Sequence, residues 1–350
     1  MSLRKGLLLF FTFTIGVGVI ILFSSVDGRT YHLLLRANKK GILLALVCTV
    51  TAWCFDALRF CAVARAASEK INFKLGLAIT WLNYFGCAVT PMQTGGGPFQ
   101  IYVLYKHNIP IGKGVAITLV RTMLTMFLLG LVVPIAVMVE PGLLLGHHIL
   151  AGFFLYVVVF VLFSWALIIL SLLRPDIMKH WGQIVTLLLK KFGMVKPRSV
   201  LLTIRRINHE IDNYTMNFKL FFTSGRRSFA HALLFSVLHL FFLFSVLPML
   251  IYSIGLDFNY LQTVLTQGVF MFILYFIPTP GASGVAEGGG AALFSLFLPW
   301  NIAGVMAITW RFFTEYLAIF MGAIVAAKMI GWDTSQEIFK KDSENYDRYQ

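Results

Sequence analysis

Two arginines lie well inside apolar stretches of the sequence, and their charge is the clearest sign of chemistry. Arg121 lies in the stretch 115–139 and Arg311 in the stretch 301–328. An arginine at the centre of a bilayer costs about 2.5 kcal/mol or more, so each should face a partner or an aqueous cavity. A guanidinium is permanently charged and holds phosphate or carboxylate through paired hydrogen bonds. The functional hypothesis is that both arginines contact the phosphate of a lipid in transit.

Acidic residues close in sequence give Arg311 a second interpretation, in which it pairs inside the protein. Glu315 follows Arg311 by four residues and shares its helical face, and Glu287 lies in a glycine-rich segment before it. Alanine substitution separates the two roles, because loss of function with an intact folded yield indicates substrate binding. Collapse of the yield indicates a structural salt bridge instead. We expect the first outcome for both Arg311 and Arg121.

Arg121 has no acidic residue nearby in the sequence, which favours a substrate-binding role. If it faces a counter-ion across a cavity, the candidates are Asp56 and Glu287. Asp56 lies three residues before Arg59 in the stretch 41–64, so these two could neutralise each other on one helical face. The Asp56–Arg59 pair is therefore interpreted as structural.

Two further apolar segments are interrupted by proline and clustered glycine. The segment 75–105 is broken by TPMQTGGGP (90–98), and the segment 259–298 by PTPGASGVAEGGG (278–290). Such residues free backbone N–H and C=O groups, which cost several kcal/mol each in hydrocarbon unless protein or water satisfies them. Each segment is therefore expected to be a helix, a break and a second helix lining a cavity. The alternative is a surface loop between two ordinary spans.

The breaks could also bind an anion through backbone N–H groups at the start of a half-helix. Two such clusters in corresponding places carry more weight than one. The candidates are the N–H groups of Gly95, Gly96, Gly97, Gly284 and Val285, with Gln93, Thr94, Gln100 and Ser283 as side-chain partners.

The composition places these motifs inside a bilayer. Hydrophobic residues make up 58% of the chain, charged residues 13%, and the mean hydropathy is +0.81. The net charge of +14 does not indicate a nucleic-acid partner, because the basic residues fall between hydrophobic stretches. The fold expected is an all-α polytopic membrane protein with two re-entrant hairpins and about six full spans, at 6–23, 41–64, 115–139, 149–173, 229–252 and 301–328.

Charge assigns the sides of the membrane. The connector 174–228 holds eleven Lys and Arg against three acidic residues, and part of it has the pattern of an interfacial amphipathic helix, so it is placed in the cytoplasm with both termini. The loops 140–148 and 253–258 carry no Lys or Arg, as expected outside. The loop 24–40 is basic, yet this scheme places it outside. A single crossing at 75–105 would reverse the first two helices and place this loop inside, and this alternative remains open.

Under the re-entrant scheme the chain divides into two membrane repeats of opposite orientation, 1–140 and 141–328, followed by a cytoplasmic polar tail at 329–350. Each break has Thr-Pro followed by a glycine four residues after the proline, at Pro91 and at Pro280. An arginine follows that glycine after 26 residues in the first repeat (121 − 95) and 27 in the second (311 − 284). Inverted repeats with broken helices are typical of transporters whose substrate site lies between the repeats.

No catalytic signature accompanies these motifs. The sequence has no G-x-S-x-G, Walker A, H-E-x-x-H or dinucleotide fingerprint, and its cysteines and histidines lack metal-ligand spacing. The sequence therefore predicts a protein that is not an enzyme and that needs no cofactor or metal.

With these residues in hand, the chain resembles the flippase-like transmembrane family typified by the membrane region of lysylphosphatidylglycerol synthases, which includes the YbhN-type proteins. The resemblance covers nearly the whole chain and rests on TPMQTGGGPFQIYVLYK (90–106), PTPGASGVAEGGGAALF (278–294) and Arg311 with Glu315. The family's P-G-x-x-G-x-x-E pattern carries over to Pro280, Gly281, Gly284 and Glu287. The candidate path for a lipid headgroup comprises Asp56, Arg59, Thr94, Gly95, Gly96, Gly97, Gln100, Arg121, Pro280, Gly281, Ser283, Gly284, Glu287, Arg311 and Glu315.

Two departures qualify the resemblance. The first motif often has an acidic residue after its glycine, where this sequence has Gln100, so a step that depends on an acid is in doubt there. The soluble aminoacyl-transferase domain is also expected to be missing, because only a polar tail follows Lys328. The protein is therefore not expected to carry out that synthesis.

What the resemblance implies is movement of a lipid, anionic or phosphate-bearing, between leaflets of a bacterial cytoplasmic (inner) membrane. The expected partners are membrane lipids. Two alternatives stay open. One is a secondary transporter of a small organic anion or ion, and the other is an accessory protein that presents lipid to a separate lipid-modifying transferase.

Overall fold

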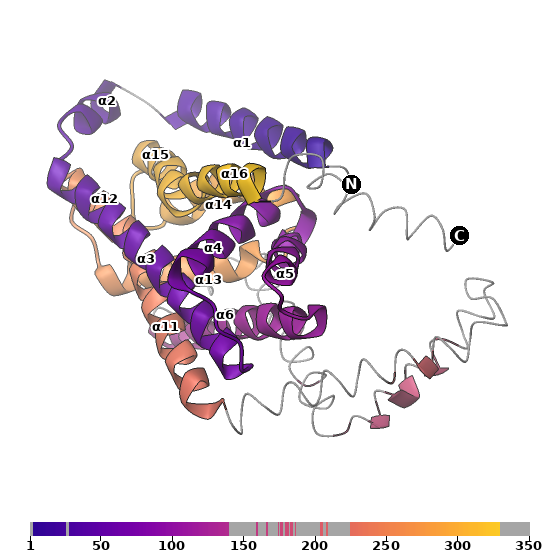
Figure 1. Cartoon of the computed structure of the whole chain (residues 1–350). Helices are drawn as coiled ribbons and strands as arrows, with labels where there is room; N and C mark the ends of the chain where they lie inside the picture. The colour runs from indigo at the N-terminus through magenta and orange to yellow at the C-terminus, as the bar shows by residue number, and fades with distance from the viewer. Residues whose placement is uncertain are drawn as a thin grey trace.

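The computed structural model describes residues 3–25, 28–139 and 225–329, with isolated positions between 159 and 208. The regular elements in these ranges are all helical (Figure 1). Most of the predicted span 149–173, most of the connector 174–228 and the tail 329–350 apart from Met329 lie outside the described ranges. Five helical stretches there are long and apolar enough to cross a membrane: Gly6–Ser24, Lys39–Ala66, Ile111–Ala136, Arg226–Ser253 and Trp300–Met329. They match the other five predicted spans.

Within the described ranges the structure has α-helices and three non-α helical segments. In chain order the elements are α1 (Leu3–Ser25), α2 (Gly28–Leu35), α3 (Lys39–Ala66), α4 (Phe73–Ala88), η1 (Pro91–Gln93), α5 (Gly96–Lys106), α6 (Ile111–Val139), α11 (Arg226–Phe244), α12 (Val246–Ser253), α13 (Tyr260–Leu274), η3 (Pro280–Ala282), α14 (Val285–Phe294), α15 (Trp300–Arg311), η4 (Phe312–Tyr316) and α16 (Leu317–Met329). Figure 1 shows α1 along the outside of α14 and α15, which it contacts.

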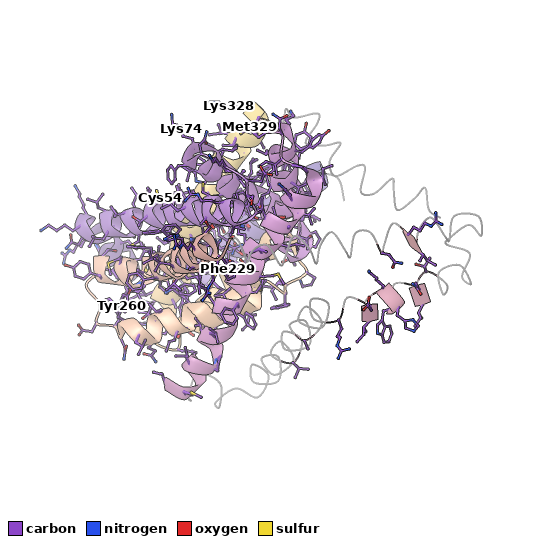
Figure 2. All side chains as sticks on the ribbon, turned by 60° about the horizontal axis from the view of Figure 1, so that its bottom comes forward. Cys54, Lys74, Phe229, Tyr260, Lys328 and Met329 are labelled. Carbon is purple, nitrogen blue, oxygen red and sulfur yellow. The ribbon has the colours of Figure 1, made fainter. Side chains whose placement is uncertain are left out.

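Several chain segments meet at one end of the helix bundle, which we call the lysine-rich end. Lys113, in the first turn of α6, pairs with Glu69 of the α3–α4 turn at 2.6 Å. Lys106, the last residue of α5, donates a hydrogen bond to the carbonyl oxygen of Met329 at 3.3 Å. Figure 2 shows Lys74 near Met329 and Lys328. Both limbs of the segment 75–105 therefore have their outer ends here.

The other end of the bundle holds the termini of several other helices. The amide of Asn38 donates to the carbonyl oxygen of Ser253 at 2.6 Å, which brings the start of α3 to the end of α12. The side chain of Asn301 donates to Thr30 at 3.0 Å, which places the start of α15 beside α2. Tyr260, at the start of α13, lies away from the labelled lysines in Figure 2. The helix α3 thus runs antiparallel to α11 and α12.

The first broken segment turns back on itself. Its limbs α4 and α5 have 16 and 11 residues, fewer than the roughly 20 that cross a bilayer. A Cβ added to Gly86 would lie 2.6 Å from the carbonyl oxygen of Gly95, so only glycine allows this close approach. The rings of Phe85 and Phe99 pack beside it, 5.7 Å apart between centroids. The break thus forms a compact turn around Pro91.

The second broken segment has the same plan with a different backbone. Its limbs α13 and α14 have 15 and 10 residues, and the turn between them includes η3. Gly281 and Gly284 have φ angles of +59° and +84°, in the left-handed region that favours glycine. Pro280 and Gly281 are buried, so this break is not a surface loop.

The two breaks meet inside the protein. The amide of Gly281 donates to the carbonyl oxygen of Thr90 at 3.4 Å, across 191 residues of sequence (281 − 90). A Cβ added to Gly281 would lie 3.0 Å from the Cα of Ala88, so the contact needs glycine on one side. Two segments that are distant in sequence therefore share one central position, and the polar residues around them become neighbours.

Candidate functional site

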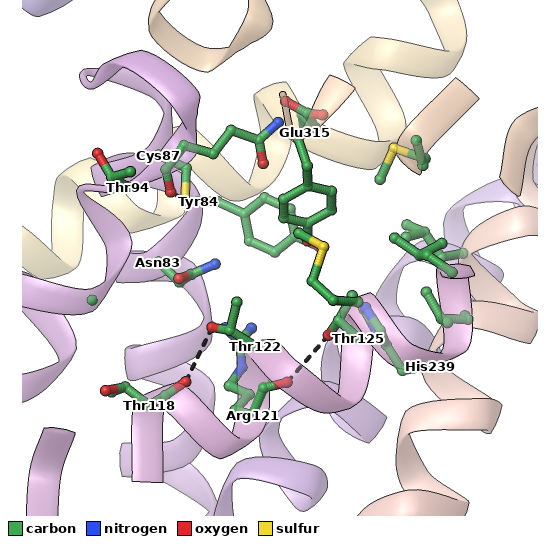
Figure 3. A pocket seen from close by; sticks show the side chains of 18 of the residues that line it. Asn83, Tyr84, Cys87, Thr94, Thr118, Arg121, Thr122, Thr125, His239 and Glu315 are labelled. Carbon is green, nitrogen blue, oxygen red and sulfur yellow. Dashed lines mark hydrogen bonds between the residues drawn. The ribbon is translucent and has the colours of Figure 1, made fainter. Parts of the chain in front are cut away.

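A cavity of about 350 Å³ lies beside the meeting point of the breaks. Its walls come from α3, α4, α6, α11, α13 and η4, together with both breaks. The charged side chains at its surface are Arg59, Arg121 and Glu315. Figure 3 shows Arg121 and Glu315 on opposite sides of this space, with Tyr84 between them in this view. The cavity is therefore lined by both polar and apolar residues, with charge at two separate positions.

The first charged position is the Asp56 cluster, formed by Asp56, Arg59 and Arg121. Asp56 is fully buried, and its two carboxylate oxygens each accept a hydrogen bond from a different guanidinium: Oδ1 from Nη2 of Arg59 and Oδ2 from Nη2 of Arg121. A longer bond of 3.3 Å joins Nε of Arg121 to Oδ1. Arg59 also donates through Nη1 to the hydroxyl of Thr125 at 2.6 Å. One carboxylate thus ties α3 to α6.

The Asp56 cluster carries an excess positive charge, because it holds two guanidinium groups and one carboxylate. Arg121 lines the cavity and is 6% exposed. Its Nη1 has no hydrogen-bond partner among the described residues. The neighbouring hydroxyls of Thr122 and Thr125 donate to carbonyl oxygens one turn earlier on α6, at 3.0 and 3.3 Å, as the dashed lines in Figure 3 mark. Nη1 of Arg121 is thus a hydrogen-bond donor without a described partner at this wall.

The second charged position belongs to the Arg311 cluster, formed by Glu287, Arg311 and Glu315. Arg311 donates from Nη1 to Glu315 at 2.8 Å and from Nη2 to the carbonyl oxygen of Gly281, and its Nε lies 3.3 Å from Glu287. The side chain is fully buried and does not reach the cavity surface. Arg311 therefore holds the second break to α14 and α15 and has no free face for a substrate.

Both carboxylate oxygens of Glu287 also have partners inside the protein. Its Oε2 accepts a hydrogen bond from the amide of Gly284 at 2.7 Å, which caps the start of α14. Its Oε1 accepts a hydrogen bond from the hydroxyl of Tyr316 at 2.5 Å. The ring of Phe10 packs edge-on to that of Tyr316, so α1 covers this side of the cluster. Glu287 thus serves the packing of the second break.

Glu315 is the member of the Arg311 cluster that faces the cavity. It lies in η4, a π-helical turn, and its Oε1 is the atom bound to Arg311. Its Oε2 has no partner among the described residues, and the side chain is 11% exposed. Two carboxylates and one guanidinium give this cluster an excess negative charge. A π-turn inside a helix is often found where a side chain must be aimed at a functional site.

The predicted ion pairs are present. Asp56 binds Arg59 and is also the counter-ion of Arg121. Of the two candidates for Arg121, Glu287 is instead a partner of Arg311, as Glu315 is. The spacing of four residues places Glu315 on the same helical face as expected.

The predicted anion-binding turns are only partly open. The amide of Gly95 donates to the hydroxyl of Thr90 at 2.7 Å, and that of Gly284 donates to Glu287 at 2.7 Å. These two N–H groups are therefore not open to an anion, because each half-helix is capped by a side chain of its own break. Gly97 and Thr94 line the cavity.

Three other predicted residues lie inside the packing around the breaks. Gly96 is buried and so close to Asn83 that the two must pack directly. Gln100 and Ser283 are each 1% exposed, and each has a buried polar atom without a partner among the described residues, Nε2 and Oγ respectively. These side chains contribute to the protein interior at the breaks and are absent from the cavity lining.

Several cavity residues were not singled out from the sequence. Tyr84 and Tyr275 line the cavity, and their hydroxyls have no hydrogen bond to described residues. His239 also lines it and bonds through Nδ1 to the carbonyl oxygen of Ala52 at 2.9 Å. A tyrosine shortly before each break was the available signal, because a polar-tipped ring in an apolar limb is suited to a partly wet wall.

Known proteins are similar to this chain over the region that contains the candidate site. Residues 7–322 match the family described as the lysylphosphatidylglycerol synthase TM region. A UPF0104 membrane protein of Archaeoglobus fulgidus is 25% identical over 319 residues, which are 89% of this chain and 93% of that protein. The family match includes both breaks and both ionic clusters, so the whole candidate site lies within the matched region.

Proposed function

The chain belongs to the lysylphosphatidylglycerol synthase TM region family, and on this basis we propose that it moves a phosphate-bearing lipid between the two leaflets of its membrane. The observation that carries the proposal is the orientation of Arg121. Its guanidinium lies at a cavity wall with one nitrogen unpaired, inside a cluster of excess positive charge. A phosphate oxygen is a suitable acceptor for that nitrogen.

The cavity provides what a headgroup needs on its way through hydrocarbon. A charged headgroup at the bilayer centre requires polar partners, because its own hydration is lost there. The cavity wall supplies such partners from the first break, through Gln93 and Thr94, and from α6, through Thr118, Arg121 and Thr122. The headgroup is proposed to cross through this polar space while its acyl chains stay in the surrounding lipid.

Reconstitution in liposomes tests this function directly. The full chain is incorporated with phospholipids labelled on one acyl chain, and exchange is followed as the fraction of label that a membrane-impermeant quencher reaches. We expect faster exchange than in empty liposomes, and slower exchange for Arg121→Gln. No exchange above empty liposomes would overturn the proposal. Uptake of a water-soluble organic anion in its place would favour the secondary transporter.

We further propose that the segments 75–105 and 259–298 are re-entrant hairpins of two inverted repeats, 1–140 and 141–328. Both outer ends of the first hairpin lie at the lysine-rich end, where Lys113 pairs with Glu69. The helices α3 and α6 have the reverse directions of α11–α12 and α15, which supports opposite orientation of the repeats. The basic residues at that end favour the cytoplasmic side for it and for both termini.

Cysteine labelling tests this topology. In a variant with its own four cysteines replaced by alanine, single cysteines are introduced by Lys70→Cys, Lys113→Cys and Tyr260→Cys. An impermeant thiol reagent should reach the first two from the same side of sealed vesicles and the third from the other. Labelling of positions 70 and 113 from opposite sides would support the single crossing and refute the hairpin.

A further inference from the structure

The two ionic clusters leave opposite charges unmatched at two positions of one cavity. The Asp56 cluster has two guanidinium groups for one carboxylate, and the Arg311 cluster has two carboxylates for one guanidinium. A net charge buried in a low-dielectric interior is costly unless a partner of opposite sign compensates it. The cavity therefore has a place for one negative and one positive group, separated in space.

The atoms that remain unpaired identify those two places. Nη1 of Arg121 is a donor without a partner, and Oε2 of Glu315 is an acceptor without a partner, among the described residues. Both residues line the cavity, and Figure 3 shows them on opposite sides of it. Neither cluster can neutralise itself, because Asp56 already binds both arginines and Arg311 already contacts both glutamates.

We propose that the cavity recognises a zwitterionic phospholipid headgroup, with the phosphate at Arg121 and a single ammonium group at Glu315. The proposal rests on the proposed lipid translocation and names its substrate class. A headgroup with one phosphate and one ammonium group matches both unpaired atoms and has no net charge. An anionic headgroup leaves Glu315 uncompensated, and an aminoacylated headgroup with two ammonium groups brings one positive charge too many.

The aromatic side chains of the cavity fit the ammonium end. Tyr84 and Tyr275 both line the space, and Tyr84 is seen between Arg121 and Glu315 in Figure 3. An ammonium group is attracted to the face of an aromatic ring, and a carboxylate beside such a ring adds direct charge pairing. The volume of about 350 Å³ admits a small headgroup without its acyl chains.

A comparison of three lipids tests the substrate class. Liposomes with the full chain contain a small fraction of acyl-labelled phosphatidylethanolamine, phosphatidylglycerol or lysylphosphatidylglycerol, in an otherwise identical phosphatidylcholine bilayer. The host lipid is itself zwitterionic, and it competes equally with the labelled lipid in all three samples. Exchange of phosphatidylethanolamine should exceed that of the other two by about tenfold, because each mismatched lipid leaves a charge unpaired. Equal rates for the three lipids, or a preference for the anionic or the cationic one, would overturn the inference.

The variant Glu315→Gln tests whether Glu315 is responsible for the lipid preference. The variant keeps the shape of the side chain and loses its charge, so the preference for phosphatidylethanolamine over phosphatidylglycerol should fall to about equality. The matched control is Glu69→Gln, which makes the same change in a carboxylate that pairs with Lys113 away from the cavity. This control should keep the preference of the unchanged protein. An unchanged preference in a folded Glu315→Gln protein would refute the assignment.

A proton is the other positive charge that Glu315 could accept, and the same assay separates it from an ammonium group. Proton binding predicts that phosphatidylglycerol moves fastest, at a rate that rises at low pH and loses this dependence in Glu315→Gln. That outcome would overturn the zwitterion assignment and leave lipid translocation standing. If no lipid moves above empty liposomes, the proposed function itself fails.

Discussion

The two ionic clusters both join arginines to carboxylates, but they serve the structure differently. In the Arg311 cluster, three groups surround one guanidinium, and the side chain is fully buried. In the Asp56 cluster, two guanidinium groups share one carboxylate, and Arg121 keeps a free nitrogen at the cavity. Burial of an arginine in a membrane protein is therefore not enough to mark a substrate site. The number of acceptors around it decides whether it can bind anything else.

This difference indicates that Arg311 stabilises the second break, whereas Arg121, in the first half of the chain, is proposed to bind the substrate. Arg311 connects the break to α14 and α15 through Gly281 and two carboxylates, so its loss frees several elements at once. Arg121 joins only α6 to α3, and Arg59 remains to neutralise Asp56 if Arg121 is removed. The same substitution should thus have opposite effects on stability and activity in the two clusters.

The largest effect is expected for Arg311→Ala. It leaves Glu287 and Glu315 buried without a counter-ion, and breaking a buried pair in this way typically costs about 3–5 kcal/mol. In contrast to the intact yield expected from the sequence, we expect a large loss of folded yield and a marked fall in melting temperature, because Arg311 is fully paired inside the protein. The measurements are size-exclusion chromatography and thermal unfolding in detergent. Lys328→Ala, at an exposed position of α16, is the control and should unfold like the unchanged protein. A normal melting temperature for Arg311→Ala would contradict the structural role.

Arg121→Gln should reverse that pattern. The amide keeps some hydrogen bonding but loses the charge at the cavity, so lipid exchange is expected to fall tenfold or more, where each factor of ten is about 1.4 kcal/mol. Asp56 remains paired with Arg59, and the melting temperature should change little. The measurement is the liposome exchange assay beside a thermal melt of the same preparation. Full activity in a folded protein would remove Arg121 from the binding site.

The contacts in these clusters that could be predicted from the sequence are those between residues close together along the chain. Glu315 and Arg311 are four residues apart, so helical geometry alone brings them together, as it does for Asp56 and Arg59 three apart. Arg121 and Asp56 are separated by 65 residues, and the sequence indicated only that Asp56 was a candidate. The excess charge of each cluster could not be counted before the partners were known.

The breaks show the same limit. Proline and clustered glycine predicted where the helices are interrupted, because these residues disrupt helical hydrogen bonding in any context. They did not predict that Thr90 caps Gly95 or that Glu287 caps Gly284, since a carbonyl, a hydroxyl and a carboxylate compete for the same N–H groups. The contact of Gly281 with Thr90 depends on the packing of both segments and has no local signature.

The variant Gly281→Ala tests how much the contact between the two breaks contributes to stability. At a φ of +59° an alanine costs about 1–2 kcal/mol, and its Cβ would also press on Ala88, the last residue of α4 before the first break. We expect a moderate fall in melting temperature, smaller than for Arg311→Ala. Gly97→Ala is the control in the first break, where an added Cβ meets nothing within 4 Å. Equal melting temperatures for the two variants would show that contact between the breaks contributes nothing to stability.

The smallest effect is expected for Lys113→Ala, which removes an ion pair at the lysine-rich end. The two side chains are 35% and 21% exposed, so water screens their attraction. Pairs of this kind contribute about 0–1 kcal/mol, and we expect a value near the lower limit, read from the thermal melt at low and at high salt. A loss comparable to that of Arg311→Ala would contradict the contrast between buried and exposed pairs. In that case the approach of α6 to the α3–α4 turn, and not the polar interior, would be the contact on which the first half depends.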